Sequence, residues 1–367
     1  MIPIAFTGGG TGGHIYPGLA VAMILRELLP GRIFWIGSAA GMDRSIVEGA
    51  GFEFFGVPSG KLRRYFSLKN ISDIIKVNAG FWAARCILKK EKPGLLFSKG
   101  GFVSVPPCAA AASLGIPVFT HESDYSPGLA TRINARFARR IFTAYEDTAA
   151  FFAPAFREKV TAVGNPVRPG FRNANAAAGR AFMEIGPEER VLLVLGGSQG
   201  AREINELIRE CLPVLTKYYT VVHQTGPGQD WDLPASERYR PYAYIREEMP
   251  QVLAAAELVL GRSGAGTVWE AAAAGKPMAL IPLRGSGTRG DQVENAGVFE
   301  KAGAAVVIGG NASSLKETAV VLTRTIIELA ENAELRNAMT AASERIGNRD
   351  GAELIARIIL SAVTGEV

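Results

Sequence analysis

The sequence predicts an α/β protein built of two Rossmann-like domains, each with a doubly wound parallel sheet. Three observations carry this prediction. The chain has 367 residues, which is enough for about two domains of ~150 residues each. Short apolar runs, typical of strands buried on both faces of a parallel sheet, alternate with helical patterns. Both halves also begin with the same succession of apolar strand, glycine-rich loop and helix, at residues 2–29 and 191–215.

The first half opens with the strand IPIAF (2–6), the loop TGGGTGGH (7–14) and the helix PGLAVAMILRELL (17–29). Further apolar runs predict strands at residues 33–37, 94–98, 117–121 and 140–144. Proline and glycine interrupt the pattern in VGNPVRPG (163–170), where we expect the domains to be joined. The first domain is therefore expected to cover residues 1–163.

The second half opens with the strand VLLVL (191–195), the loop GGSQGA (196–201) and the helix REINELIRECLPVL (202–215). Further strands are expected at residues 219–226, 242–245, 258–261 and 278–283. The second domain is expected to cover residues 164–346. The last helix, 353–363 within a C-terminal segment of about 347–367, is amphipathic and can pack on either domain, including back on the first. Because ligands bind beyond the carboxyl ends of such strands, we expect the chemistry in a cleft between the domains.

The composition excludes several classes of protein. No run of about eighteen apolar residues occurs, so no membrane-spanning helix is expected. The N-terminus lacks the basic region of a signal peptide. The three cysteines are far apart and odd in number, which favours a reducing compartment over a disulfide framework or a zinc site.

The net charge of +5 is unevenly distributed. Residues 1–163 contain 19 Lys and Arg against 11 Asp and Glu, whereas residues 164–367 contain 21 against 24. The excess is densest between Lys61 and Lys92, with nine basic residues and two acidic ones. A basic surface attracts nucleic acid, anionic lipid or a phosphorylated substrate. A solvated face without a partner is the alternative.

Three glycine-rich loops are the strongest indication of a ligand. In the first loop, five of the six residues 8–13 are glycine, which lets backbone N–H groups at a helix N-terminus approach a phosphate or a polar substrate closely. A tight turn alone needs only one or two glycines. The other two loops lie in SKGGFVSVPPC (98–108) and GRSGAGTVWEAAAAGKP (261–277).

The first loop also matches the dinucleotide-binding pattern, as Gly8-x-Gly10-x-x-Gly13. That pattern requires an acidic residue at the end of the second strand, where this chain has Gly37-Ser38-Ala39. No Walker A sequence is present, so a P-loop ATPase is not expected. A nicotinamide-dependent dehydrogenase is therefore only the second alternative.

Two titratable residues are candidates for chemistry. His14 follows the first glycine loop and is expected in the first turn of the helix, where the helix dipole favours the neutral imidazole of a general base. The other histidines, His121 and His223, lie within or at the end of predicted strands, where a structural role is common. Glu270 lies three residues after Thr267, so it either closes a capping box or holds the hydroxyl groups of a ribose.

Taken in order, the motifs resemble those of the MurG family of glycosyltransferases. They are GGGTGGHIYPGLAVA, GGFVSVP, HESDYSPGLATR, VGNPVR, GGSQGAREIN, HQTG and RSGAGTVWEAAAAGKP with DQVENA, and they cover roughly residues 3–303. The resemblance implies a GT-B fold, with an acceptor- and membrane-binding first domain and a UDP-sugar-binding second domain around a cleft. It also implies inverting transfer of N-acetylglucosamine from UDP-N-acetylglucosamine to the C4 hydroxyl of N-acetylmuramic acid in lipid I, which is undecaprenyl-pyrophosphoryl-MurNAc-pentapeptide. The product is lipid II, for peptidoglycan synthesis, and neither a cofactor nor a metal is strictly required.

The resemblance also assigns residues. It implies catalytic roles for His14, as the base, and for Glu122, close to the acceptor. It places Gly10, Thr11, Gly12 and Gly13 on the acceptor pyrophosphate and the donor sugar, and Gln292 and Asn295 on the sugar. Those that it places on the UDP moiety are Arg168, Ser198, Ile245, Arg262, Ser263, Gly264, Ala265, Thr267 and Glu270, with Ile245 on uracil and Glu270 on the ribose. The resemblance also implies that Asp124 and Asp291 bind substrate, but both depart from the family, because Asp124 stands where an asparagine usually touches the sugar and Asp291 where glutamine or histidine is common.

A lipid acceptor gives the basic cluster a possible meaning, because the enzyme must then work at the cytoplasmic face of the bacterial inner membrane. The segment 71–90 places apolar Ile75, Phe81 and Trp82 among cations such as Lys89, as peripheral attachment to anionic lipid requires. An ordinary helix with its apolar face in the core is the alternative, and no nucleic-acid partner is expected. Other functions left open are a transferase with a different lipid acceptor, a sugar-nucleotide epimerase and a non-catalytic nucleotide-sugar-binding scaffold.

Overall fold

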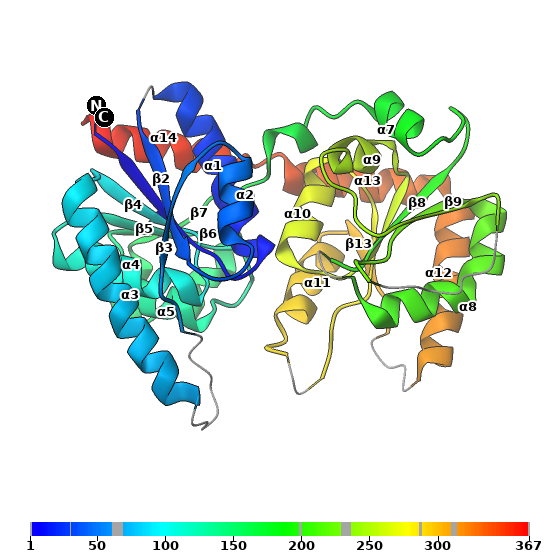
Figure 1. Ribbon diagram of the computed structural model, residues 1–367. Helices are drawn as coiled ribbons and strands as arrows, with labels where there is room; N and C mark the ends of the chain where they lie inside the picture. The colour runs from blue at the N-terminus through cyan, green and yellow to red at the C-terminus, as the bar shows by residue number, and fades with distance from the viewer. Residues whose placement is uncertain are drawn as a thin grey trace. The chain divides into compact units, whose positions relative to one another are not determined.

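The chain forms two compact α/β units. The computed structural model describes residues 2–29, 31–60, 69–197, 200–228, 236–285, 288–309 and 314–365, and only the backbone of 69–72. Unit 1 consists of Met1–Arg168 together with Asp350–Val367, and unit 2 of Pro169–Arg349. Each unit has one parallel sheet flanked by helices (Figure 1). The predicted fold class is confirmed.

Unit 1 contains a seven-stranded sheet in the order β3-β2-β1-β4-β5-β6-β7. The strands are β1 (Ile4–Thr7), β2 (Ile33–Ser38), β3 (Glu53–Val57), β4 (Leu95–Ser98), β5 (Val118–Glu122), β6 (Arg140–Thr143) and β7 (Val160–Ala162). The helices are α1 (Gly12–Leu28), α2 (Asp43–Gly49), α3 (Lys69–Glu91), α4 (Val105–Ser113), α5 (Leu129–Asn134), α6 (Pro154–Arg157) and α14 (Gly351–Thr364).

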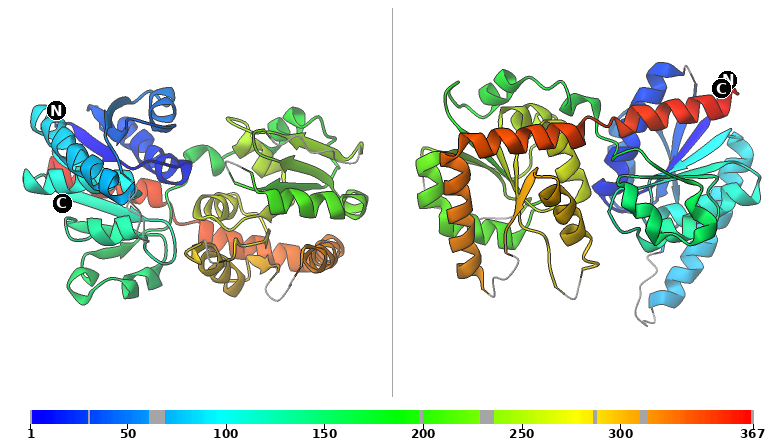
Figure 2. Two further views of the ribbon diagram at one scale, coloured as in Figure 1. Left: turned by 60° about the horizontal axis from the view of Figure 1, so that its bottom comes forward. Right: turned by 180° about the vertical axis from the view of Figure 1, so that it is seen from behind.

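Unit 2 contains a six-stranded sheet in the order β10-β9-β8-β11-β12-β13. The strands are β8 (Val191–Leu195), β9 (Thr220–Gln224), β10 (Tyr239–Tyr242), β11 (Leu258–Gly261), β12 (Met278–Leu280) and β13 (Ala305–Val307). The helices are α7 (Ala176–Phe182), α8 (Arg202–Tyr218), α9 (Met249–Ala255), α10 (Ala265–Ala273), α11 (Asp291–Lys301), α12 (Leu315–Glu331) and α13 (Ala333–Gly347). Helices α8 and α12 lie side by side and bury Leu192 and Val194 of β8 (Figures 1 and 2).

The core of unit 1 joins the two ends of the chain. Residues Ile355 and Ile359 of α14 are fully buried in the same cluster as Leu25 of α1 and Phe6 of β1. Figure 1 accordingly shows both termini in this unit. Trp35 stacks on Phe6 at 5.6 Å between ring centroids, and its Nε1 donates to the carbonyl of Gly8 at 2.9 Å. This tryptophan therefore fixes the start of the first glycine loop.

The order of the strands decides where a ligand can bind. In unit 1 the connections reverse direction between β1 and β4, and in unit 2 between β8 and β11. Thr7 is paired with Ser98, and Leu195 with Gly261, so two loops leave each sheet side by side at this point. Ligands of open α/β sheets bind at such a switch point, and all three predicted glycine loops lie at one.

One predicted strand is wrong. The segment 242–245 overlaps strand β10, which consists of Tyr-Arg-Pro-Tyr at 239–242, only at Tyr242. Pro241 has no N–H to give to a sheet, and an edge strand such as β10 tolerates it because one side of the strand needs no partner. Strands β3, β7 and β13 were not predicted from the sequence.

Candidate functional site

The first glycine loop is held in shape by a buried carboxylate from α2. Asp43 accepts hydrogen bonds from the N–H of Gly10 at 2.9 Å and from the N–H of Ser38 at 2.9 Å. Gly10 has a φ of +86°, and a Cβ on Gly9 would lie 1.9 Å from the Asp43 Oδ2, so both positions require glycine. Asp43 was not predicted as a site residue, because nothing in its local sequence links it to the loop.

Helix α1 begins inside this loop, earlier than predicted. Its N-cap is Thr11, and Gly12 and Gly13 form the start of its first turn, which contains no acidic residue. The N-terminus of this helix is therefore suited to bind an anion, because no carboxylate of its own first turn competes for the N–H groups. His14 lies in the first turn, as predicted.

The imidazole of His14 packs against the second glycine loop. Gly100 and Gly101 have φ values of +81° and +76°, and a Cβ on Gly101 would lie 2.9 Å from His14 Cδ2. That Cβ would also lie 2.8 Å from the carbonyl of Gly9. The two glycine loops of unit 1 therefore touch each other and enclose one side of the half-buried imidazole.

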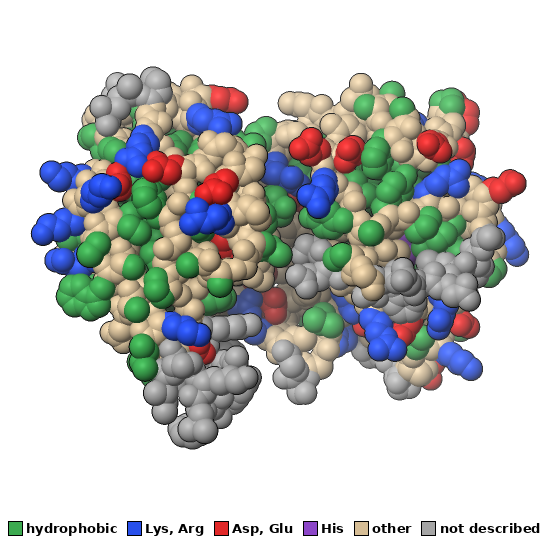
Figure 3. Space-filling view, in the orientation of Figure 1, with side chains coloured by type: hydrophobic (Ala, Val, Ile, Leu, Met, Phe, Trp, Pro, Cys, Tyr) green, Lys and Arg blue, Asp and Glu red, His purple; other side chains and the backbone are tan. Residues whose placement is uncertain are grey.

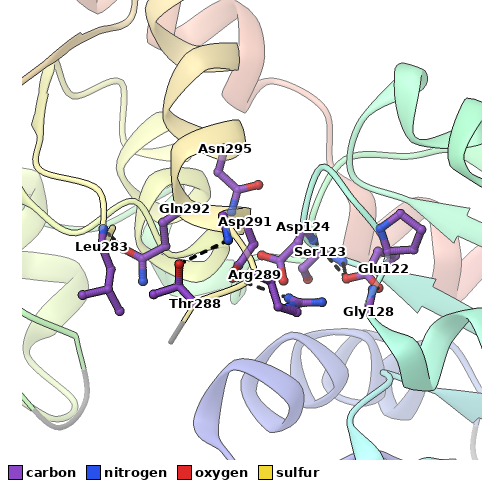
Figure 4. Close-up of polar contacts among 12 residues, drawn as sticks. Glu122, Ser123, Asp124, Gly128, Leu283, Thr288, Arg289, Asp291, Gln292 and Asn295 are labelled. Atoms are coloured by element: carbon purple, nitrogen blue, oxygen red, sulfur yellow. Dashed lines mark hydrogen bonds and ion pairs between the residues drawn. The ribbon is translucent and has the colours of Figure 1, made fainter. Parts of the chain in front are cut away.

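Glu122 organises the loop that follows β5. Its Oε1 accepts from the N–H groups of Ser123 at 2.9 Å and Asp124 at 3.1 Å, and its Oε2 accepts from that of Gly128 at 3.0 Å (Figure 4). These contacts show a carboxylate that fixes the backbone of residues 123–128, including half-buried Asp124. A direct catalytic part for Glu122 stays a prediction.

The contacts of Arg168 and His121, two further residues of unit 1, indicate their roles. The guanidinium of Arg168 lies 4.9 Å from the ring centroid of Tyr16, in the second turn of α1. Arg168 is therefore held close to the helix whose N-terminus borders the first glycine loop.

His121 is fully buried and its Nε2 lies 3.0 Å from the carbonyl of Gly164. Desolvation, and then the charge of Lys99, lower the pKa of His121 well below its ordinary value, which indicates a neutral, structural histidine.

In unit 2 the loop after β11 is fixed from within the protein. Arg262 is buried and forms an ion pair with Glu203 at 2.5 Å, and it also donates to the carbonyl of Ile281 at 3.0 Å. These contacts indicate that Arg262 supports the loop. Gly264 and Gly266 have open space beside them instead, because a Cβ at either position would meet no atom within 4 Å. Ala265, the first residue of α10, is buried between them.

The structure removes one of the two roles considered for Glu270. Helix α10 begins at Ala265 with Gly264 as its N-cap and has no side-chain cap. Thr267 is therefore the third residue of the helix and cannot be the N-cap of a capping box with Glu270. The capping hypothesis is wrong because the glycine loop itself supplies the extended residue that starts the helix. Glu270 lies half-buried in the second turn of α10.

The position predicted to meet uracil is already partly hydrogen-bonded. The N–H of Ile245 donates to the Oε1 of Gln224 at 2.9 Å, and the side chain of Ile245 is buried. Gln224 ends β9, and its Nε2 donates to the carbonyl of Gly197 at 3.3 Å. Gln224 was not predicted as a site residue, although its place at the end of a strand is a signal for one. Ser198, predicted to meet the diphosphate, lies outside the described residues.

His223, the neighbour of Gln224, is structural. Its two ring nitrogens lie 3.0 Å from the Tyr239 hydroxyl and 3.0 Å from the Asn205 Oδ1. Desolvation lowers the pKa of His223 to about 4, so the neutral form is stable in the core.

The start of α11 is tied to the loop after β11. Ser263 donates to the backbone carbonyl of Gln292 at 2.7 Å, and Asn295 donates to the carbonyl of Ser263 at 3.3 Å. The Gln292 Oε1 accepts from the N–H of Leu283 at 2.9 Å (Figure 4). Asn295 is fully buried, so its contacts indicate that it supports the loop. Asp291, the first residue of α11, forms an ion pair with Arg289 at 3.5 Å.

Helix α3 carries the predicted membrane patch, and the residues of this patch differ in their exposure to solvent. Trp82 and Ile75 are 60% and 65% exposed, and Lys89 is also exposed. Phe81 instead packs against the buried cluster that contains Ala84. Figure 3 shows hydrophobic and basic side chains together over the region where Figure 1 draws α3. No helix in the described part of the chain is long and apolar enough to cross a membrane.

Comparison with known proteins identifies relatives of both units. The family model described as glycosyltransferase family 28 N-terminal domain matches residues 4–143, and that for the family 28 C-terminal domain matches residues 191–355. A Treponema denticola protein is 51% identical over 84% of each chain, and a Treponema pallidum protein is 49% identical over 83% of this chain and 82% of its own. Both are named UDP-N-acetylglucosamine–N-acetylmuramyl-(pentapeptide) pyrophosphoryl-undecaprenol N-acetylglucosamine transferase. The crystal structure of Acinetobacter baumannii MurG shares the fold, with a TM-score of 0.73 at 22% identity over 98% of this chain and 100% of its own.

Proposed function

Because the chain belongs to the MurG family of glycosyltransferases, we propose roles for its residues in the reaction of that family. The chain is a hexosyltransferase that moves N-acetylglucosamine from UDP-N-acetylglucosamine to lipid I and forms lipid II. The observation that carries this conclusion is the 51% identity to a transferase of that name across 84% of the chain. The geometry of the two units supports the finer assignment.

Unit 2 is proposed to bind the UDP moiety. Its α10 N-terminus has no acidic residue in the first turn, and Gly264 leaves open space above it, which suits a diphosphate. Glu270 is proposed to accept hydrogen bonds from the ribose hydroxyls. The N–H of Ile245 is already bonded to Gln224, so the carbonyl of Ile245 is proposed to meet uracil. The N–H would meet uracil only if Gln224 turned away when the nucleotide binds. Ser198, and Arg168 at the end of unit 1, are proposed to meet the diphosphate, and helix amides with an arginine can stabilise leaving UDP without a metal.

Unit 1 is proposed to bind lipid I and to supply the base. His14 would take the proton of the C4 hydroxyl as that oxygen attacks the anomeric carbon, with inversion of configuration. Gly10, Thr11, Gly12 and Gly13 would meet the acceptor pyrophosphate and the donor sugar. Their contact with the loop at Gly100 and Gly101 supports this proposal, because it holds the imidazole of His14 against a rigid glycine surface.

We propose further that the protein is peripheral and works at the cytoplasmic face of the membrane. Exposed Trp82 and Ile75 on α3 support contact with the lipid surface, and Lys89 supports attraction to anionic headgroups. At this place the protein would serve peptidoglycan synthesis, and through it cell shape and division.

The test is transfer from radiolabelled UDP-N-acetylglucosamine to a short-chain lipid I analogue, with and without EDTA. Labelled disaccharide lipid in both samples is the expected result, for a metal-independent transferase. Loss of transfer in EDTA alone would overturn the metal-independent mechanism. Release of UDP without disaccharide, or epimerisation of the sugar, would overturn the acceptor assignment and indicate a different reaction on the same fold.

A further inference from the structure

We propose that Lys99 is a positioning residue, which holds the loop 123–128 as the counter-charge of Glu122 and Asp124. The inference rests on the proposed function of unit 1 in acceptor binding. Lys99 is only 1% exposed, and its Nζ donates to the Ser123 Oγ at 2.6 Å. Ser123 in turn donates to the Asn165 Oδ1 at 2.5 Å. The ammonium therefore binds the residue that lies between the two carboxylates in the chain.

Lys99 also touches the first glycine loop. It follows β4, whose last residue, Ser98, is paired with Thr7. Its N–H donates to the carbonyl of Thr7 at 2.8 Å, and a Cβ on Gly8 would lie 3.1 Å from the Lys99 Cβ. One buried lysine thus connects the loop that carries His14 with the loop that carries Asp124. A change at Lys99 would disturb both surfaces of the proposed acceptor site together.

The charges around Lys99 explain why a buried ammonium is stable here. Burial lowers its pKa to about 8, and the negative charges of Glu122 and then Asp124 act in the opposite direction. Other titratable groups close by include His121, whose pKa is well below its ordinary value, and His14 beside the same glycine loop. The protonated state of Lys99 thus depends on the charges of Glu122 and Asp124. The loop 123–128 depends in turn on the ammonium, which donates to Ser123.

Because the charge of Lys99 depends on pH, a positioning role can be distinguished from a role in packing alone. Above a pH of about 8 the ammonium loses its proton, and the loop loses its counter-charge. Asp124→Asn removes one of the anions that keep the proton on Lys99, so it should move this transition to lower pH. Lys99→Arg keeps its charge at every pH of the experiment, because an arginine pKa is above 12.

The experiment measures transfer to the lipid I analogue through the alkaline range for the wild type, Lys99→Arg, Lys99→Met and Asp124→Asn. We expect an alkaline fall in kcat/KM for the acceptor near pH 8 in the wild type. The fall should shift to lower pH in Asp124→Asn and disappear in Lys99→Arg. Lys99→Met should lower kcat/KM for the acceptor by about 10- to 100-fold at neutral pH, as expected for loss of a charged hydrogen bond, while the affinity for UDP stays unchanged.

An alkaline fall that is the same in the wild type, Asp124→Asn and Lys99→Arg would overturn the proposal. The Asp124 variant keeps it testable if substitution of the buried lysine prevents folding. If the wild type transfers no sugar, the proposed function fails and Lys99 is examined directly, by NMR titration of the side-chain resonances of lysine. A Lys99 resonance that titrates near pH 8 in the wild type, and lower in Asp124→Asn, would support the charge coupling, and an unshifted one would refute it.

Discussion

At the scale of single residues, the site depends on side chains that hold backbone loops. Asp43, Glu122 and Gln224 each accept hydrogen bonds from backbone N–H groups of a loop at the carboxyl edge of a sheet. A loop made of glycine has little side-chain contact of its own and a large conformational entropy in the unfolded chain. Buried acceptors of this kind therefore decide whether such a loop keeps one shape.

Asp43 provides the clearest test of this principle. Asp43→Ala removes two hydrogen bonds to a charged group, so the free energy of unfolding should fall by roughly 2–4 kcal/mol. The KM for the lipid I analogue should rise more than that for UDP-N-acetylglucosamine, because the loop belongs to unit 1. Asp43→Asn keeps one acceptor oxygen and should lie between the wild type and the alanine variant in both measurements. Equal changes in the two KM values would indicate general destabilisation.

His14 is the residue whose substitution should affect chemistry without affecting nucleotide binding. His14→Ala should lower kcat by roughly the 10²- to 10⁴-fold expected for loss of a general base. The affinity for UDP, measured by calorimetry, should be unchanged because the nucleotide is assigned to unit 2. A normal kcat in this variant would remove His14 from the mechanism.

Several of these residues could be predicted from the sequence, and others could not. The glycine loops and His14 were predictable because strand, loop and helix follow one another locally. Asp43 and Lys99 were not, since their partners Gly10 and Ser123 are 33 and 24 residues away in the chain. Glu270 was misinterpreted in part, because a glycine N-cap starts α10 earlier than the threonine motif suggests.

At the scale of elements, burial decides which strands the sequence reveals. Strands β1, β2 and β8 are buried along their whole length and consist mostly of apolar residues. The strands that were missed or misplaced, β3, β7, β10 and β13, are the edges of the two sheets. An edge strand needs fewer apolar residues and tolerates proline, so its sequence pattern is weak.

Helix α3 shows how one element can serve both core and membrane. Ile75→Ser with Trp82→Ser should reduce binding to vesicles of anionic lipid while the affinity for UDP stays the same, because both side chains are exposed. Phe81→Ser is the matched control, since Phe81 packs against the core. It should lower the free energy of unfolding by about 2 kcal/mol and change vesicle binding less. Unchanged vesicle binding in the double variant would show that α3 is not the membrane contact.

At the scale of the whole molecule, the chain returns to its first unit after completing its second. Segment 350–367 follows all of unit 2, yet it belongs to the same compact unit as β1 and α1. Its helix begins with Gly351, where a Cβ would lie only 2.9 Å from the carbonyl of Gly164. The close approach of these two segments lets the returning chain enter the core of unit 1 at once.

This connection predicts that substitutions near the C-terminus destabilise the N-terminal part of the chain. Ile355→Ala or Ile359→Ala empties a fully buried position beside α1, and should lower the stability of unit 1 by about 2–5 kcal/mol. Amide hydrogen exchange should then show lost protection in β1 and α1, with β8 and α8 unchanged and UDP affinity retained. Leu354→Ala on the same helix is the control, because this side chain is 44% exposed and its loss should matter little. Equal loss of protection in β8 would mean that the two units unfold together, and that α14 stabilises the molecule as a whole.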